Sequence, residues 1–155
     1  MKNNKLSHMR EDGMVNMVDV KDKEVSKRVA RAKGHITLRK ETIELIAENN
    51  LKKGSVLSAA QIAGIMAAKK CPELIPLCHP LLLTKIDVEV RIDLTGVYVE
   101  SLVSCTGKTG VEMEALTAVS VALLTVYDMC KAVDNSMAID NTELIEKSKM
   151  SSQNQ

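Results

Sequence analysis

The sequence predicts an α+β fold in which helices cover one face of an antiparallel sheet. Residues 86–92 alternate apolar and charged side chains, which is the pattern of a half-buried strand. A second strand-like run, at 97–105, follows a turn at 94–96, so the two runs predict a hairpin. The third observation is a long apolar segment at 111–133, which predicts a helix of about 35 Å.

The elements before the hairpin carry weaker signals but follow in order. Residues 33–38 predict a short strand, and residues 39–50 place apolar side chains at helical spacing. Residues 58–70 predict a second helix, rich in alanine, that Ser58 would cap and that the three prolines beyond Lys70 would end.

A last strand, around residues 139–145, precedes a polar C-terminal segment. The order strand, two helices, hairpin, helix, strand is that of a ferredoxin-like sandwich. At 155 residues the chain predicts a single domain at 17–148, between a flexible N-terminal arm at 1–16 and a flexible tail at 149–155.

Composition and charge argue against several classes of protein. The net charge of +1 gives no general attraction to nucleic acid or to an anionic membrane, and the only aromatic residues are two tyrosines. A membrane span is not predicted, because only thirteen residues separate Glu114 from Asp128 in the long helix. The N-terminus resembles no signal peptide, and the four scattered cysteines predict free thiols in a reducing cytoplasm.

The charges of the long helix lie at its two ends. Asp128 and Lys131 are three residues apart and can touch, either as a surface ion pair or as a partly buried acid–base pair. Glu112 and Glu114 suit the positive end of the helix dipole, and capping alone would explain them. Glu114 and Asp128 stand 14 residues apart, about 21 Å along the axis, so a site using both would need a second subunit.

Residues 72–83 (PELIPLCHPLLL), the proline loop, contain all three prolines of the chain. The segment is either a buried crossover or a rigid backbone that aims His79 at a ligand. A zinc site built from Cys71, Cys78 and His79 matches no familiar ligand spacing. The loop at 106–110 (TGKTG) lacks the earlier glycine of a phosphate-binding loop, so a plain strand-to-helix turn is the simpler interpretation.

Several longer motifs together resemble one family. They run in order along the chain as MVDV at 17–20, KG at 53–54, AGIMAAKK at 63–70, ELIPLCHPL at 73–81, TGKTGVEMEALTAVSVALLTVYDMCKAV at 106–133 and LIEKS at 144–148. In this combination they resemble the cyclic pyranopterin monophosphate synthases of molybdenum cofactor biosynthesis.

The resemblance implies more than composition or periodicity does. It implies a ferredoxin-like subunit in a homohexamer, a trimer of dimers, with active sites at the subunit interfaces. The implied substrate is a 3′,8-cyclic dihydro-GTP, which is rebuilt as a pyranopterin with a cyclic phosphate while pyrophosphate leaves. No redox cofactor and no protein-bound metal are implied, and Mg²⁺ accompanying the triphosphate stays open.

The resemblance also assigns site residues where the motifs match. It implies catalytic roles for Lys53, Asp128 and Lys131. It implies substrate binding by residues of the proline loop and the long helix, namely Leu77, Cys78, His79, Glu112, Met113 and Glu114. Lys69 is a further candidate on its position alone, because a lysine at the end of the second helix can meet phosphates of the substrate as a point charge.

One departure from the family pattern lies at the C-terminus. Family members usually end in a glycine-rich KSGGKSG segment, whereas this chain has KSKMSS at 147–152, so a mobile contact built on those glycines is in doubt. The alternative function is a non-catalytic nucleotide-binding regulatory module, since a ferredoxin-like fold by itself does not define an activity.

Overall fold

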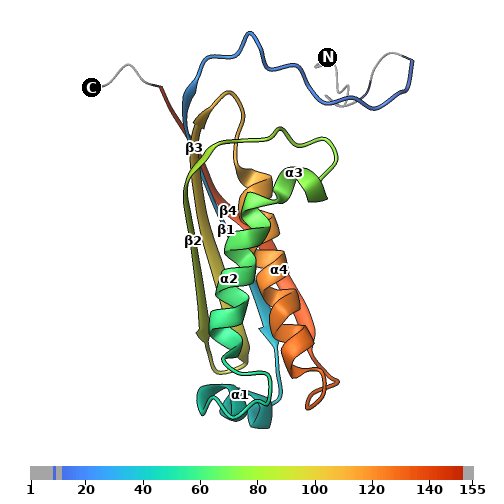
Figure 1. Cartoon of the computed structure of the whole chain (residues 1–155), viewed down its shortest axis with the longest axis vertical. Coiled ribbons are helices and arrows are strands. Elements are labelled where there is room, and N and C mark those ends of the chain that lie inside the picture. Colours follow the sequence, from blue (N-terminus) through green and yellow to red (C-terminus); the bar gives the residue numbers. More distant parts are fainter. Residues whose placement is uncertain (1–8, 10–11, 152–155) are drawn as a thin grey trace.

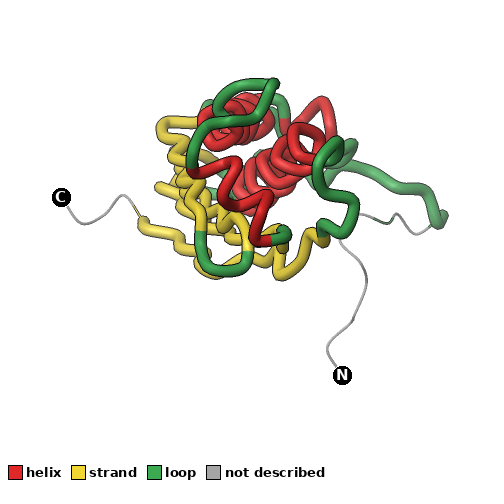
Figure 2. The backbone as a smooth tube through the Cα atoms, turned by 90° about the horizontal axis from the view of Figure 1, so that it is seen from below, coloured by secondary structure: helices red, strands yellow, loops and turns green. Residues whose placement is uncertain are grey.

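The computed structural model of the chain describes Met9 and residues 12–151. Four antiparallel strands form one sheet in the order β2-β3-β1-β4, and all the helices lie on one face of it (Figures 1 and 2). The strands are β1 (Ser26–Thr37), β2 (Leu83–Ile92), β3 (Gly96–Gly107) and β4 (Ala138–Ser151). The strand order and the single helical layer confirm the predicted ferredoxin-like α+β sandwich.

The predicted hairpin is confirmed as β2 and β3, which pair from Ile92 opposite Val97 to Leu83 opposite Cys105. The Asp93 side chain closes the turn by accepting hydrogen bonds from the backbone N–H groups of Thr95 (2.8 Å) and Gly96 (3.0 Å). Apolar side chains of both strands face the helices, and charged side chains occupy the open face.

Strand β1 begins seven residues before the predicted strand at 33–38, at Ser26. Its core-facing positions are small, including Ala30, Ala32 and Gly34, so the sequence shows no strong apolar alternation. A Cβ atom at Gly34 would lie 2.7 Å from a methyl group of Val119, in the long helix above. The small residues of β1 therefore let that helix approach the centre of the sheet closely.

The helices are α1 (Lys40–Ala47), α2 (Val56–Lys69), α3 (Cys71–Leu74) and α4 (Glu112–Cys130). The predicted cap of α2 was wrong, because Ser55 occupies the cap position and its hydroxyl accepts a hydrogen bond from the Ser58 N–H at 3.4 Å. Pro72 sits in the first turn of α3, where its missing N–H costs nothing, so the chain makes one more turn before the proline loop.

Helix α4 contacts β1, β3 and α2, and its inner side is fully buried at Val119, Leu123 and Val126. By length and apolar composition α4 would suffice to cross a membrane, yet half of that apolar window is buried inside the protein. Burial against the sheet and α2 accounts for its apolar character, as a core helix requires.

Strand β4 contains the predicted last strand and continues through the polar segment to Ser151, which pairs with Ser26 of β1. The strand therefore includes residues 149–151 of the segment that we predicted to be a flexible tail, while 152–155 lie outside the described residues. Polar side chains suit this strand because it lies at the sheet edge, where hydrogen bonds to β1 supply the pairing. Of the predicted arm, Met9 and Val15 form an isolated bridge.

Candidate functional site

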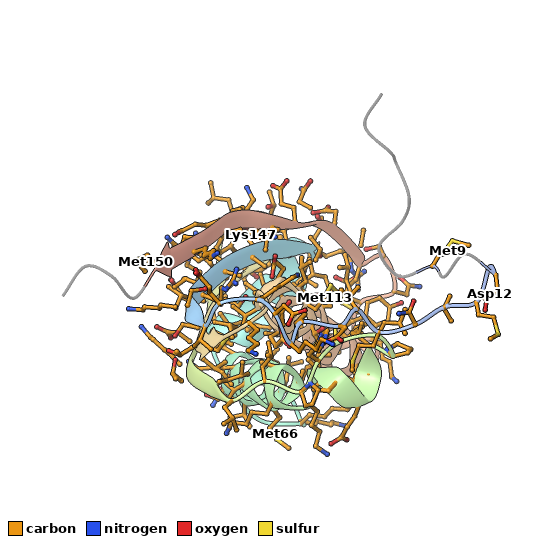
Figure 3. All side chains as sticks on the ribbon, turned by 90° about the horizontal axis from the view of Figure 1, so that it is seen from above. Met9, Asp12, Met66, Met113, Lys147 and Met150 are labelled. Carbon is orange, nitrogen blue, oxygen red and sulfur yellow. The ribbon has the colours of Figure 1, made fainter. Side chains whose placement is uncertain are left out.

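A pocket of about 480 Å³ opens where α4 begins. This end of α4 lies on the side of the molecule that carries the segment before β1 (Figure 1). The proline loop, the start of α4 and the segment before β1 surround the pocket, and Met113 lies near the middle of this end of the molecule (Figure 3). The pocket is lined by six of the predicted substrate-binding residues, Leu77, Cys78, His79, Glu112, Met113 and Glu114.

The segment before β1 forms a wall of this pocket through Val18, Val20 and Lys23. His79 Nε2 donates a hydrogen bond to the carbonyl oxygen of Val18 at 2.7 Å, so the bond to this wall does not use Nδ1 of the same ring. The Lys108 ammonium donates to the carbonyl oxygen of Lys21 at 2.5 Å. Sequence reasoning assigned no site role to this wall, and the MVDV motif at 17–20 was the only signal for it.

Glu114 is the buried acid of the pocket, with 3% of its surface exposed. Burial raises the pKa of its carboxyl, and the nearby charge of Glu112 acts in the same direction. Burial likewise raises the pKa of the neighbouring Cys71 thiol to about 12 and that of Cys78 above its usual value. These thiols are therefore poor nucleophiles at neutral pH.

Cys71, Cys78 and His79, the residues of the zinc alternative, are not arranged around a common point as metal ligands would be. Within residues 12–151 and Met9, no group of three or more His, Cys, Asp or Glu side chains is placed to hold a metal ion. The Sγ atom of Cys71 instead lies 3.7 Å from the Thr117 hydroxyl, inside the core.

A second cluster lies at the other end of α4 and joins the three predicted catalytic residues. Lys53 Nζ is 3.0 Å from one carboxylate oxygen of Asp128, and Lys131 Nζ is 2.6 Å from the other. Lys53 also donates to the Asp128 carbonyl oxygen at 2.8 Å. One carboxylate thus bridges two ammonium groups.

The electrostatics of this cluster differ from the partly buried pair considered from the sequence. The side chains of Asp128 and Lys131 are both 58% exposed in the single chain. Hydrogen bonds from Lys131 and Lys53 lower the pKa of Asp128, and the hydrogen bond to Asp128 raises the pKa of Lys131. Both groups are therefore charged at neutral pH.

Local structure explains how Lys53 reaches α4. Gly54 ends the turn after α1 with φ at +88°, a conformation that favours glycine, and its N–H bonds to the carbonyl oxygen of Leu51 at 3.0 Å. The start of α1 is tied to the end of α4 by Asp134, which is 1% exposed and accepts from the Arg39 N–H at 2.8 Å and the Thr42 hydroxyl at 3.1 Å.

The two clusters do not meet within one chain. Glu114 and Asp128 lie 14 residues apart on a single uninterrupted helix, or about 21 Å along its axis. Lys69 is exposed in the last turn of α2 and does not line the pocket. The structure thus groups nine of the ten predicted site residues into two sets at opposite ends of α4.

The fold and these two clusters define a ferredoxin-like protein whose pocket, of small-molecule size, has a mainly apolar lining with two acids at the start of α4. The model of the MoaC family matches residues 17–149. The chain is 55% identical to the cyclic pyranopterin monophosphate synthase of Pelotomaculum thermopropionicum over 92% of this chain and 85% of the relative. It is 57% identical to that of Methylobacterium sp. (strain 4-46), over 92% and 91% of the two chains. The chain belongs to the MoaC family.

Proposed function

We propose that this chain converts (8S)-3′,8-cyclo-7,8-dihydroguanosine 5′-triphosphate into cyclic pyranopterin monophosphate and pyrophosphate, an early step of molybdenum cofactor biosynthesis. Family membership over residues 17–149 supports this function. The observation that carries it is the grouping of the motif residues into an acid-lined pocket and a Lys–Asp–Lys cluster. The reaction moves protons and forms a cyclic phosphate without net redox change, so it needs no redox cofactor.

The proposed active site combines the pocket of one subunit with the Lys–Asp–Lys cluster of another. The 21 Å between Glu114 and Asp128, estimated from the helical rise, exceeds what one nucleotide easily bridges along a rigid helix. A homohexamer built as a trimer of dimers, with sites at the interfaces, would bring the two sets together. The four cysteines are free thiols, which suits the proposed cytoplasmic setting.

Charge states support separate roles within the Lys–Asp–Lys cluster. Asp128, ionised at neutral pH, can accept protons during ring opening and rebuilding. Lys131 holds its proton tightly, so it suits stabilisation of negative charge better than proton donation. Lys53 shares the same carboxylate and can stabilise charge that develops on the triphosphate as pyrophosphate leaves.

The pocket would recognise the guanine-derived part of the substrate. Glu114 and the backbone of residues 77–79 and Met113 can bind the adjacent N–H donors of that edge. Lys69, outside the pocket of its own chain, is proposed to meet phosphate as a point charge.

The test is turnover of the cyclic dihydro-GTP by the purified chain, followed by pyrophosphate release and by pterin fluorescence after oxidation. Lys53→Ala and Asp128→Asn should each lower turnover by about 10²- to 10⁴-fold while substrate still binds. Lys52→Ala is the matched control, because Lys52 is exposed on the same turn and should retain activity. Substrate binding without any pyrophosphate release by the unaltered chain would favour the regulatory module instead.

A further inference from the structure

We propose that Lys147 of β4 is a positioning residue that holds the Glu112 carboxylate in place at the substrate pocket. The inference rests on the proposed function of that pocket and extends it to the C-terminal strand. Lys147 belongs to the LIEKS motif at 144–148, and the departure from the family pattern begins only after Ser148. In the structure β4, which contains this motif, runs beside β1 and ends level with the first residue of β1.

The register of β4 directs Lys147 toward the helical face of the sheet. Lys147 pairs with Ala30, whose side chain is buried beneath the helices. Its neighbour Glu146 pairs with Arg31 and forms an ion pair with it across the open face at 3.7 Å. Because directly paired residues of antiparallel strands share a face, Lys147 must point to the side on which α4 begins.

Lys147 Nζ forms an ion pair with Oε1 of Glu112, the first residue of α4. Figure 3 shows Lys147 on β4, beside the end of the molecule where Met113 lies. Glu112 is the more enclosed partner, with 23% of its side chain exposed against 62% for Lys147. Among the described residues, Lys147 is the only side chain that forms an ion pair with either acid of the pocket.

The Glu112 carboxylate is confined from a second side by Gly110. A Cβ atom at Gly110 would overlap the carboxylate, so the group lies directly against that backbone. Held between Gly110 and Lys147, the carboxylate stays at the pocket rim instead of sampling the rotamers open to an exposed glutamate. The Lys147 charge also offsets one of two neighbouring negative charges in a pocket that must admit an anionic substrate.

The experiment is a double-mutant cycle on the full chain in its native assembly, with turnover of the cyclic dihydro-GTP as one readout. Lys147→Ala should raise KM by about two- to fivefold, the range expected for a half-exposed ion pair, and leave kcat nearly unchanged. Lys147→Arg should restore KM. Lys149→Ala is the control, because Lys149 lies two residues along the same strand and should have no effect.

The Glu112→Gln background separates positioning from direct contact. If Lys147 acts through Glu112, then Lys147→Ala adds no further increase in KM to that of Glu112→Gln. Effects that multiply would mean that Lys147 binds substrate itself, and would overturn the inference. A fall in kcat that Lys147→Arg does not restore would overturn it as well.

A second readout needs no substrate. In a crystal structure of the Lys147→Ala chain, the Glu112 carboxylate should leave its place against Gly110 and turn toward solvent. A carboxylate that stays there would refute the positioning role, whatever the kinetics show. If the unaltered chain forms no product, the proposed function fails, and this structure still decides whether Lys147 holds Glu112.

Discussion

Mixed assemblies of two inactive variants should regain activity if each site combines the two ends of α4 from different subunits. Glu114→Gln disables the pocket, and Asp128→Asn disables the Lys–Asp–Lys cluster; both changes conserve side-chain volume. The two positions stand 14 residues apart on one helix, or about 21 Å, so a single chain cannot supply both to one nucleotide. Each variant alone should be nearly inactive.

The size of the recovery follows from random assembly. With equal amounts of both chains, half of the pockets and half of the clusters are unaltered, so about a quarter of the shared sites contain two unaltered halves. The assay is co-expression of the two chains with different tags, tandem purification and pyrophosphate release. Mixing either variant with itself under the two tags is the control. Mixed assemblies no more active than the separate variants would refute the shared site.

The remaining predictions concern charge and backbone conformation. Burial opposes ionisation of Asp134, but hydrogen bonds from the backbone of Arg39 and Ser136 outweigh it and lower the pKa to about 2, so its stabilisation is complete above about pH 4 and is lost as pH falls toward 2. Asp134→Ala should therefore lower the free energy of unfolding at pH 7 by about 3 kcal/mol in urea titrations and flatten its acid dependence; an unchanged midpoint would contradict this. Because the pKa of Asp128 is lowered, protonation of Asp128 should contribute no acid limb to kcat/KM near neutral pH, and a limb near pH 6 that Asp128→Asn removes would be evidence against it. Gly54→Ala should lower the free energy of unfolding by about 1 kcal/mol through the positive φ of residue 54 alone. Because the change also displaces Lys53, turnover should fall by more than the small loss of folded protein explains. Unchanged turnover would show that the turn is not needed.

The sequence predicted the elements that have strong periodic patterns. The hairpin at 83–107 was evident because apolar and charged residues alternate along β2, and α4 was evident from its length. Most of β1 was missed because alanine and glycine face the core, and small residues give little contrast with their neighbours. The polar end of β4 was missed because an edge strand is stabilised by backbone pairing, which leaves no apolar signature.

The sequence predicted which residues form the candidate site better than it predicted their hydrogen bonds, ion pairs and exposure. The motifs indicated the proline loop and both ends of α4, but no local pattern predicts that Val18 would accept a hydrogen bond from His79, 61 residues away. Lys147 was missed for the same reason, since its ion pair with Glu112 depends on the register of β4 against β1. The exposure of Asp128 could not be foreseen from its apolar neighbours, because apolar character does not show which of them are buried: Cys130 is, whereas Val133 is 40% exposed.

The packing of α4 determines how the two halves of the site relate to each other. Its N-terminus carries carboxylates and its C-cap carries Lys131, the arrangement that the helix dipole favours at each end. Between them, Val119 and Leu123 pack where Gly34 leaves room on β1, so the helix cannot shift along the sheet without steric conflict. The spacing of the two clusters is therefore set by a rigid core. If one active site uses both a pocket and a Lys–Asp–Lys cluster, as we propose, two subunits must supply them, and assembly is then a condition for the reaction.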